Sequence, residues 1–375
     1  MKRNLTVALI SLLSAIPSSG QEQTLDFGEG WEMSGQDTLV APYLDETGLR
    51  MRTGQAYRRD VRLEDGTIDV DVATTGLRSF VYVQFRMQSE GEHEEVYLRP
   101  HKSSLPDAIQ YAPVFHGESH WQLYHGETGT APADLPRNEW THIRIVMSGQ
   151  RAAIFVGDVP KPQLVVPLVR AAAPGYIGLR SFVPEGAGPA GQTTSFANLV
   201  VRPGEIDFDF SDTTVEPRAP EGLISEWLLS EPYVAPDGPV RELPSLVSRK
   251  WRKIQTDPSG LAVFFQHFAR PEPRKRATVL AKITLTAARA ERAPLHLGYS
   301  DEVTVFLNGE PLLSADDSYS YDRPRREGLI GLDQATVYLP LRAGENELVL
   351  AVTDVFGGWG VMGRVDTTGV TASAK

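Results

Sequence analysis

The chain has 375 residues, 41% of them hydrophobic and 23% charged, so it is too long for one ordinary core and too apolar for a disordered polypeptide. Its net charge of −11 makes DNA, RNA and anionic membrane surfaces poor partners, whereas neutral ligands such as sugars stay open. The chain has no cysteine, which excludes disulfides and a lipid-attachment cysteine. Its 33 glycines and 27 prolines favour many short strands joined by turns.

Residues 1–20 have the features of a secretory signal peptide. Lys2 and Arg3 are followed by an apolar run over residues 5–16 and by small residues before Gln21. The alternative is a short membrane anchor, but the run is shorter than the roughly 20 residues that a spanning helix needs. We therefore expect no membrane insertion, and a secreted or periplasmic bacterial protein.

Residues 21–203 alternate between apolar and polar side chains in short segments separated by turns. In residues 67–72, for example, Ile68, Val70 and Val72 share one face and acids share the other. Similar segments lie at residues 81–87, 140–147, 152–156, 175–180 and 196–201. This spacing predicts an antiparallel β-sandwich.

Residues 204–221 follow Pro203 and contain Gly204, an Asp-Phe repeat and two prolines, which predicts a linker. The Asp-Phe repeat could be one more strand. From residue 222 to 372 the alternation resumes at 261–265, 278–285, 303–307, 337–341 and 348–352. Asn308-Gly309 predicts a tight hairpin. The predicted fold class is thus all-β, with two antiparallel β-sandwich (jelly-roll) domains in tandem.

The strand over residues 93–101 directs Val96 and Leu98 toward a core and a row of polar side chains the other way. We expect this polar row and its neighbours to be exposed and to bind a ligand, because guanidinium groups, carboxylates and aromatic rings suit sugars. The alternative is a solvated face held by cross-strand ion pairs. The predicted ligand-binding residues are Gln84, Arg86, Glu95, Tyr97, Arg99, His101, Gln110, His120, Gln122 and Tyr124.

Several chemical roles are open for this region. Glu95 with His101 or His120 could form a general acid–base pair, so these three are the catalytic candidates. A zinc site from His116, His120 and His125 is conceivable, but their spacing along a strand does not converge, so no metal site is predicted there.

The acidic, aromatic loop at residues 316–322 suits structural calcium through its oxygen ligands and sugar stacking through Tyr319 and Tyr321. The alternative is a plain surface loop. No other cofactor is predicted. Trp359, between two glycines, is expected to pack over a strand end.

The first half resembles a concanavalin A-like lectin/glucanase domain, the sandwich of laminin-G modules, and is loosely similar to 3-keto-disaccharide hydrolases. The resemblance rests on short motifs at residues 25–31, 54–57, 65–71, 138–145 and 196–201. The glucanase signature Glu-x-Asp-x-x-Glu is absent. Asp69 and Asp71 form an acid pair, but on a strand that the resemblance places far from a glucanase centre. Classical sugar hydrolysis is therefore in doubt.

The second half resembles a galactose-binding-like jelly roll. Its motifs lie in the expected order at residues 224–233, 251–260, 303–309 and 341–360. The resemblance implies an accessory domain that binds glycans or packs against a partner domain.

Three functions follow from these patterns. The first is carbohydrate binding on the polar face of the first sandwich. The second is a glycoside-processing hydrolase or lyase that uses Glu95 and a nearby histidine. The third is a non-catalytic scaffold for protein interaction. The sequence leaves the glycan and the oligomeric state open.

Overall fold

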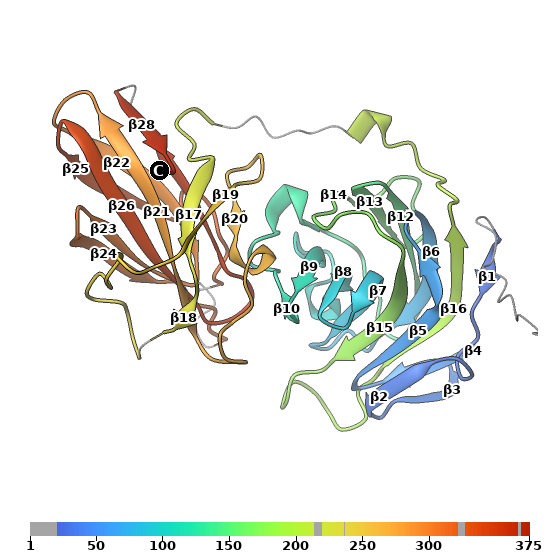
Figure 1. Ribbon diagram of the computed structural model, residues 1–375. Helices are drawn as coiled ribbons and strands as arrows, with labels where there is room; N and C mark the ends of the chain where they lie inside the picture. The colour runs from blue at the N-terminus through green and yellow to red at the C-terminus, as the bar shows by residue number, and fades with distance from the viewer. Residues whose placement is uncertain (1–20, 214–219, 236, 322–326, 367–368) are drawn as a thin grey trace, which may run out of the picture.

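The computed structural model describes residues 21–213, 220–235, 237–321, 327–366 and 369–375. It confirms an all-β fold with two sandwiches side by side (Figure 1). The predicted signal peptide at residues 1–20 lies outside the described residues and stays a prediction. No helix in the described ranges has the length and apolar character needed to cross a bilayer.

One layer of the first sandwich is the β6 sheet, whose strands are antiparallel. Its order is β14 (Leu164–Pro167), β13 (Arg151–Val156), β12 (Trp140–Ser148), β6 (Gly66–Ala73), β16 (Thr194–Pro203), β4 (Glu46–Met51) and β3 (Leu39–Tyr43), with β1 (Gln23–Thr24) paired to β16.

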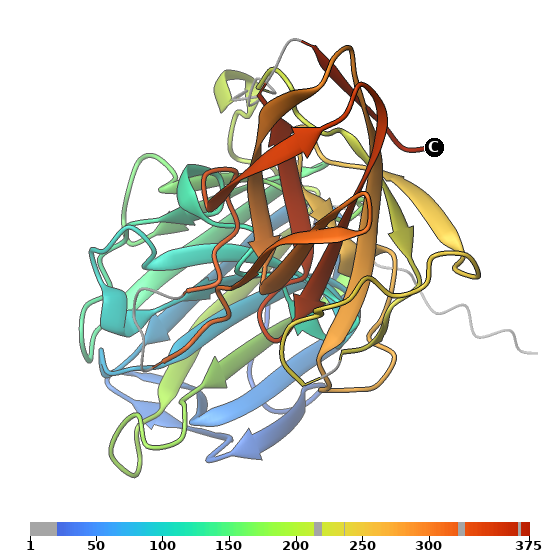
Figure 2. The same cartoon turned by 90° about the vertical axis from the view of Figure 1, so that its left-hand side faces the viewer.

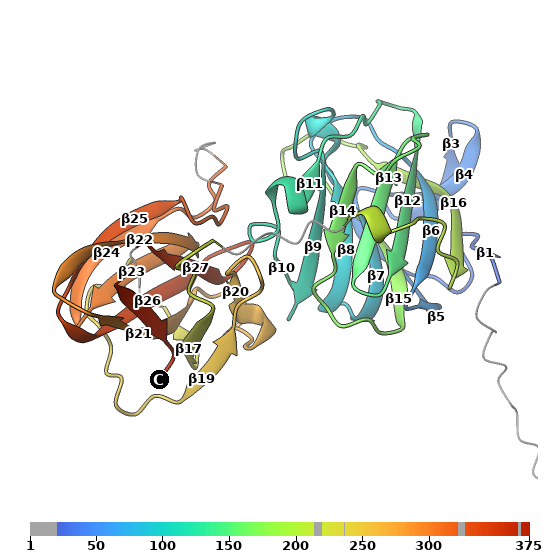
Figure 3. The same cartoon turned by 90° about the horizontal axis from the view of Figure 1, so that it is seen from above.

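The other layer is the β8 sheet. Its order is β10 (Glu118–Ser119), β9 (Ile109–Phe115), β8 (Glu92–Leu98), β7 (Phe80–Ser89), β15 (Gly175–Phe182), β5 (Thr53–Leu63) and β2 (Glu32–Gln36), with β11 (Thr130–Ala131) paired to β9. Figure 3 shows the two layers face to face.

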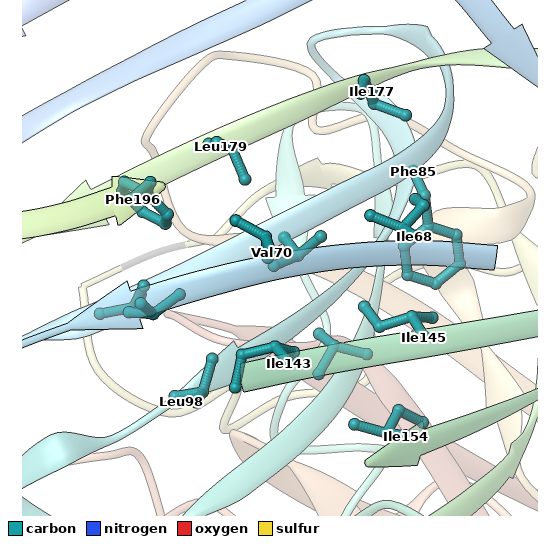
Figure 4. Close-up of a cluster of buried hydrophobic side chains, with 14 of the residues drawn as sticks. Ile68, Val70, Phe85, Leu98, Ile143, Ile145, Ile154, Ile177, Leu179 and Phe196 are labelled. Atoms are coloured by element: carbon teal, nitrogen blue, oxygen red, sulfur yellow. The ribbon is translucent and has the colours of Figure 1, made fainter. Parts of the chain in front are cut away.

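The first core fills the space between these two sheets. Ile68 and Val70 of β6 meet Phe85 of β7 and Leu98 of β8, and all of them are buried (Figure 4). Alternation puts every second side chain of each strand on this inner face, so the predicted inward residues, Val96 included, are confirmed as core. The opposite face of the β8 sheet is left for polar and aromatic side chains.

The second sandwich is built in the same way. Its β26 sheet has the order β19 (Trp251–Gln255), β17 (Glu226–Ser230), β21 (Ala277–Ala287), β26 (Gly344–Asp354), β23 (Glu302–Leu307) and β24 (Glu310–Asp316), with β18 (Tyr233–Val234) and β28 (Val370–Ser373) paired to β21. Its β22 sheet has the order β20 (Ala262–Val263), β27 (Gly360–Val365), β22 (Glu291–Ser300) and β25 (Ala335–Leu341).

Two local predictions in the second sandwich are confirmed. Asn308 and Gly309 join β23 to β24, and both have positive φ, as the tight hairpin turn requires. Trp359 is fully buried, and its Nε1 donates to the carbonyl of Val352 at 3.0 Å. Its ring therefore closes the second core at the end of β26.

The segment after β16 is not a free connection. The Asp-Phe repeat forms no strand, but Phe208 and Phe210 pack on Phe155 and Val146 on the outer face of the β6 sheet. Arg151 donates to the carbonyl of Phe210 at 2.7 Å. The short helix η3 (Ser211–Thr213) follows, and the described part of the predicted linker up to residue 213 is thereby held against the first sandwich.

Candidate functional site

The predicted ligand face does lie on the outer side of the β8 sheet, but the expectation that it is exposed is wrong. His101 and Tyr124 are half-buried, and the rest of the predicted set is buried: Gln84, Arg86, Glu95, Tyr97, Arg99, Gln110, His120 and Gln122. The physical reason is that side chains of neighbouring strands and the turn after β10 cover this face, and alternation along one strand does not reveal them.

The centre of this face is a row of cross-strand neighbours. Tyr82 of β7 lies opposite Tyr97 of β8, and their rings stack with centroids 5.1 Å apart. Gln110 of β9 continues the row on one side and Arg180 of β15 on the other. The guanidinium of Arg180 lies 4.7 Å from the ring centre of Tyr82. Stacked rings with a guanidinium above one of them form a rigid, flat floor.

Arg99 and Gln110 hold the Tyr97 ring of this floor in place through its hydroxyl group. The hydroxyl of Tyr97 donates to Oε1 of Gln110 at 2.6 Å, and Arg99 donates to the same hydroxyl at 2.6 Å. The Nε2 of Gln110 donates to the carbonyls of Trp121 and Tyr124, each at 2.6 Å. The hydrogen-bonding groups named here are therefore paired with one another and with the turn after β10, and they do not face a ligand.

Glu95 has no exposed surface. Its carboxylate accepts from Ser119 Oγ at 2.8 Å and lies 3.4 Å from Nε2 of His93 and from Nε2 of Gln84. Burial acts to raise the pKa of Glu95, but the His93 contact and other interactions hold it below its usual value. The structure thus pairs Glu95 with His93 and not with His101 or His120, so the acid–base pair expected from sequence is not formed.

Arg86, predicted to bind a ligand, instead contacts two turns of the first sandwich. Its guanidinium donates to the carbonyls of Glu64 and Gly149 and to Asp65, at distances of 2.6 to 2.9 Å. It therefore fastens two hairpin turns together and is not part of the ligand face.

His120, Gln122 and Tyr124 do not lie on a long strand, because β10 ends at Ser119 and the chain turns there. The turn inserts into the second sandwich. The ring of His120 lies 5.0 Å from that of Phe265, and Gln122 donates to Oδ1 of Asp301 at 3.0 Å. Burial lowers the pKa of His120 to about 4, so this imidazole is neutral at physiological pH.

The three histidines considered for zinc have separate partners. His116 Nδ1 lies 3.4 Å from Glu92, His120 Nδ1 lies 3.1 Å from the carbonyl of Pro113, and His125 Nε2 lies 2.6 Å from the carbonyl of Ile330. In the calcium candidate, Asp316 accepts from Ser318, and Asp322 lies outside the described residues. Calcium there stays a prediction.

Half-exposed side chains rim the floor, and we had not selected most of them from the sequence. Phe80 of β7 lies opposite Phe182 of β15, with ring centroids 6.1 Å apart, and His101 lies 5.4 Å from Phe80. Trp121 packs against the same cluster and stays partly exposed. We call the following six rings the aromatic strip: Phe80, Tyr82, Tyr97, His101, Trp121 and Phe182.

A sequence signal for Phe80, Arg180 and Phe182 was present. Phe80 shares its strand face with Tyr82, and Arg180 and Phe182 alternate in the same way along β15. Their meeting depends on the pairing of β7 with β15, which are separated by the whole of β8 to β14 in the sequence. Only that long-range register brings them into one strip.

Comparisons with known proteins add solved structures of similar shape. No family model matches the chain, and no curated protein matches it. It is similar to the carbohydrate-binding module CBM66 from Bacillus subtilis, with 14% identity over 47% of this chain and 98% of the module, and a TM-score of 0.34. It is also similar to a Bacillus licheniformis β-glucanase, with 9% identity over 50% of this chain and 99% of the enzyme, and a TM-score of 0.35.

Proposed function

We propose that the protein binds a carbohydrate on the aromatic strip. The observation that carries this proposal is the pair of partly exposed rings Phe80 and Phe182, which lie beside the buried stack of Tyr82 on Tyr97. Flat ring faces cover the apolar C–H faces of sugars, and a surface that keeps several of them in water marks an interaction site.

Polar groups beside the rings support the same proposal. Arg180 is partly exposed over Tyr82, and Gln55 of β5 lies opposite Arg180 and is also partly exposed. A guanidinium and an amide are planar donors that bond neighbouring hydroxyl or carboxylate oxygens in pairs. A few such groups beside an apolar floor give a ligand its orientation.

This proposal replaces the contact residues expected from the sequence. Tyr97, Arg99 and Gln110 form the support beneath, while Phe80, Phe182 and Arg180 provide the surface. We do not propose hydrolysis through Glu95, because the carboxylate exposes no surface to a substrate.

The test is affinity gel electrophoresis against xylan, β-glucan, mannan, levan, pectin and alginate. We expect wild type to be retarded by at least one of these glycans, and Phe182→Ala and Phe80→Ala to lose about tenfold in affinity, the equivalent of the roughly 1 kcal/mol that a ring contact contributes. Phe155→Ala is the matched control, because Phe155 is also half-buried but lies on the β6 sheet. No retardation by any of the glycans, or equal losses in all three variants, would contradict carbohydrate binding on the strip.

A further inference from the structure

The aromatic strip does not end at the border of the first sandwich. Trp121 stands edge-on to Tyr319, which follows β24 in the second sandwich, with ring centroids 5.5 Å apart. Phe356, in the loop between β26 and β27, lies 6.1 Å from Trp121 and 6.0 Å from Tyr319. In Figure 2 the orange-red segment after β24 crosses in front of the first sandwich, and the contact of Tyr319 with Trp121 joins the two. Rings from two domains therefore form one continuous surface.

Arg78, in the loop between β6 and β7, joins a further ring to this surface. Its guanidinium lies 4.1 Å from the ring centre of Tyr321 and donates to the hydroxyl of Tyr319 at 3.3 Å. Among the residues that the structure describes, no carboxylate lies within ion-pair distance of Arg78. Its Nε is buried, but the positive charge of the guanidinium suits oxygens of a ligand beside these rings.

The rings from the second sandwich are unusually exposed for their size. Tyr321 is 69% exposed and Phe356 is 53% exposed. Gln122 of the first sandwich bonds Asp301 and the carbonyl of Glu327 on the second, so the two domains are joined near these rings. Large rings kept in water on a fixed support are typical of a binding surface.

A glycine permits the close approach of the two domains at this point. Gly357 has φ +89, and a Cβ there would lie 2.6 Å from Nε1 of Trp121 and 2.7 Å from Oε1 of Gln122. Only glycine fits this conformation and this distance without strain. The backbone conformation at Gly357 thus fixes the position of Phe356 beside Trp121.

We propose that the second sandwich completes the binding site, and that the ligand is an oligosaccharide long enough to lie on the aromatic strip and on the junction rings at once. The junction rings are Tyr319, Tyr321 and Phe356. This inference rests on the proposed function, because it extends the same site. The second sandwich then acts as one half of a single site rather than as an independent binding module.

The experiment compares a disaccharide with a hexasaccharide, both prepared from the glycan that retards wild type, by isothermal titration calorimetry on the full chain. The double variant Tyr321→Ala/Phe356→Ala removes the two exposed junction rings. Tyr338→Ala is the matched control, because Tyr338 is also exposed in the second sandwich but lies on β25. Thermal unfolding of each variant reports whether it is folded.

We expect the double variant to lose about tenfold or more in affinity for the hexasaccharide and to keep its affinity for the disaccharide, while Tyr338→Ala changes neither. We also expect the hexasaccharide, and not the disaccharide, to slow amide hydrogen exchange in residues 317–321. Equal hexasaccharide affinity of the double variant and Tyr338→Ala would overturn the two-domain site. In that case Phe182→Ala still tests the strip alone, so failure of the inference is distinguishable from failure of the proposed function.

Discussion

Gln122, in the turn after β10, donates from Nε2 to Oδ1 of Asp301 at 3.0 Å, a hydrogen bond from the first sandwich to the second. Oε1 of the same amide accepts from Ser300 Oγ at 3.1 Å, and the whole side chain is buried. If the domains separated here, the buried Asp301 carboxylate would lose the Gln122 donor, which is unfavourable for a buried charged group. This hydrogen bond therefore stabilises the contact between the two domains. The junction rings keep their place beside Trp121 because of it.

We predict that Gln122→Ala lowers the free energy of unfolding by about 2 kcal/mol and uncouples the two sandwiches. Differential scanning calorimetry should show one transition for wild type and two for the variant. Gln163→Ala is the control, since the Gln163 side chain bonds the backbone of Val156 within the first sandwich. Thermograms of the same shape for the two variants would contradict the coupling role.

Phe210 gives a second prediction, on the segment between the domains. Its side chain is 5% exposed against Val146 and Ala153, although it lies beyond the last strand of the first sandwich. We expect Phe210→Ala to destabilise the first sandwich by about 3 kcal/mol, the usual cost of deleting a buried ring. Chemical denaturation of wild type and of the variant measures this difference in the free energy of unfolding. Phe356→Ala, at an exposed ring, should cost much less; a similar cost for both would mean that the packing of Phe210 adds no stability.

His142 gives a pH-dependent prediction. Its Nε2 lies 2.8 Å from Asp69 and its Nδ1 lies 2.7 Å from Asp71. These two hydrogen bonds raise the pKa of His142 to about 9. A raised histidine pKa stabilises the folded state fully below the unfolded value of about 6.5, and this stability is lost as pH rises through the folded value.

The stability difference between wild type and His142→Gln should therefore be largest near pH 6 and should vanish above about pH 9. Urea denaturation of both proteins across this range measures it. Because the imidazole is 42% exposed, the effect should be modest at physiological salt. A difference that stays constant across the range would count against the charged imidazole.

Glu94 gives a second pH-dependent prediction, this time for a group whose ionisation destabilises the fold. Its side chain points into the first core, where it accepts from the hydroxyl of Tyr111 at 2.6 Å and from the amide of Arg170 at 2.9 Å. Burial raises the pKa of Glu94 to about 7. The folded state then binds the proton more tightly than the unfolded state, so stability falls as pH rises from about 4.5 to about 7.

Glu94→Gln removes this titration. Relative to wild type, the variant should gain up to about 3 kcal/mol between pH 4.5 and pH 7.5, whatever its stability at the lower value. Guanidinium denaturation at each pH measures the gain. A stability difference that does not change with pH would show that Glu94 is already ionised at the low end.

The sequence by itself determined the strands and their inner faces. Ile68, Val70 and Val96 are core residues because alternation is a local property of one strand, and the Asn308-Gly309 turn follows from the conformations that these two residues tolerate. The all-β class and the two sets of sheets follow from such local signals, repeated along the chain.

Only the tertiary structure decided which outer face meets water. Glu95 and Tyr97 point away from the first core as their positions require, yet they are buried by neighbouring strands and by the turn at residues 120–123. The aromatic strip needs β7 beside β15, and the junction rings need the second sandwich. Exposure depends on contacts between different strands, turns and domains, such as Ser119 with Glu95 and Gln122 with Asp301, and a periodic pattern in one strand carries no information about them.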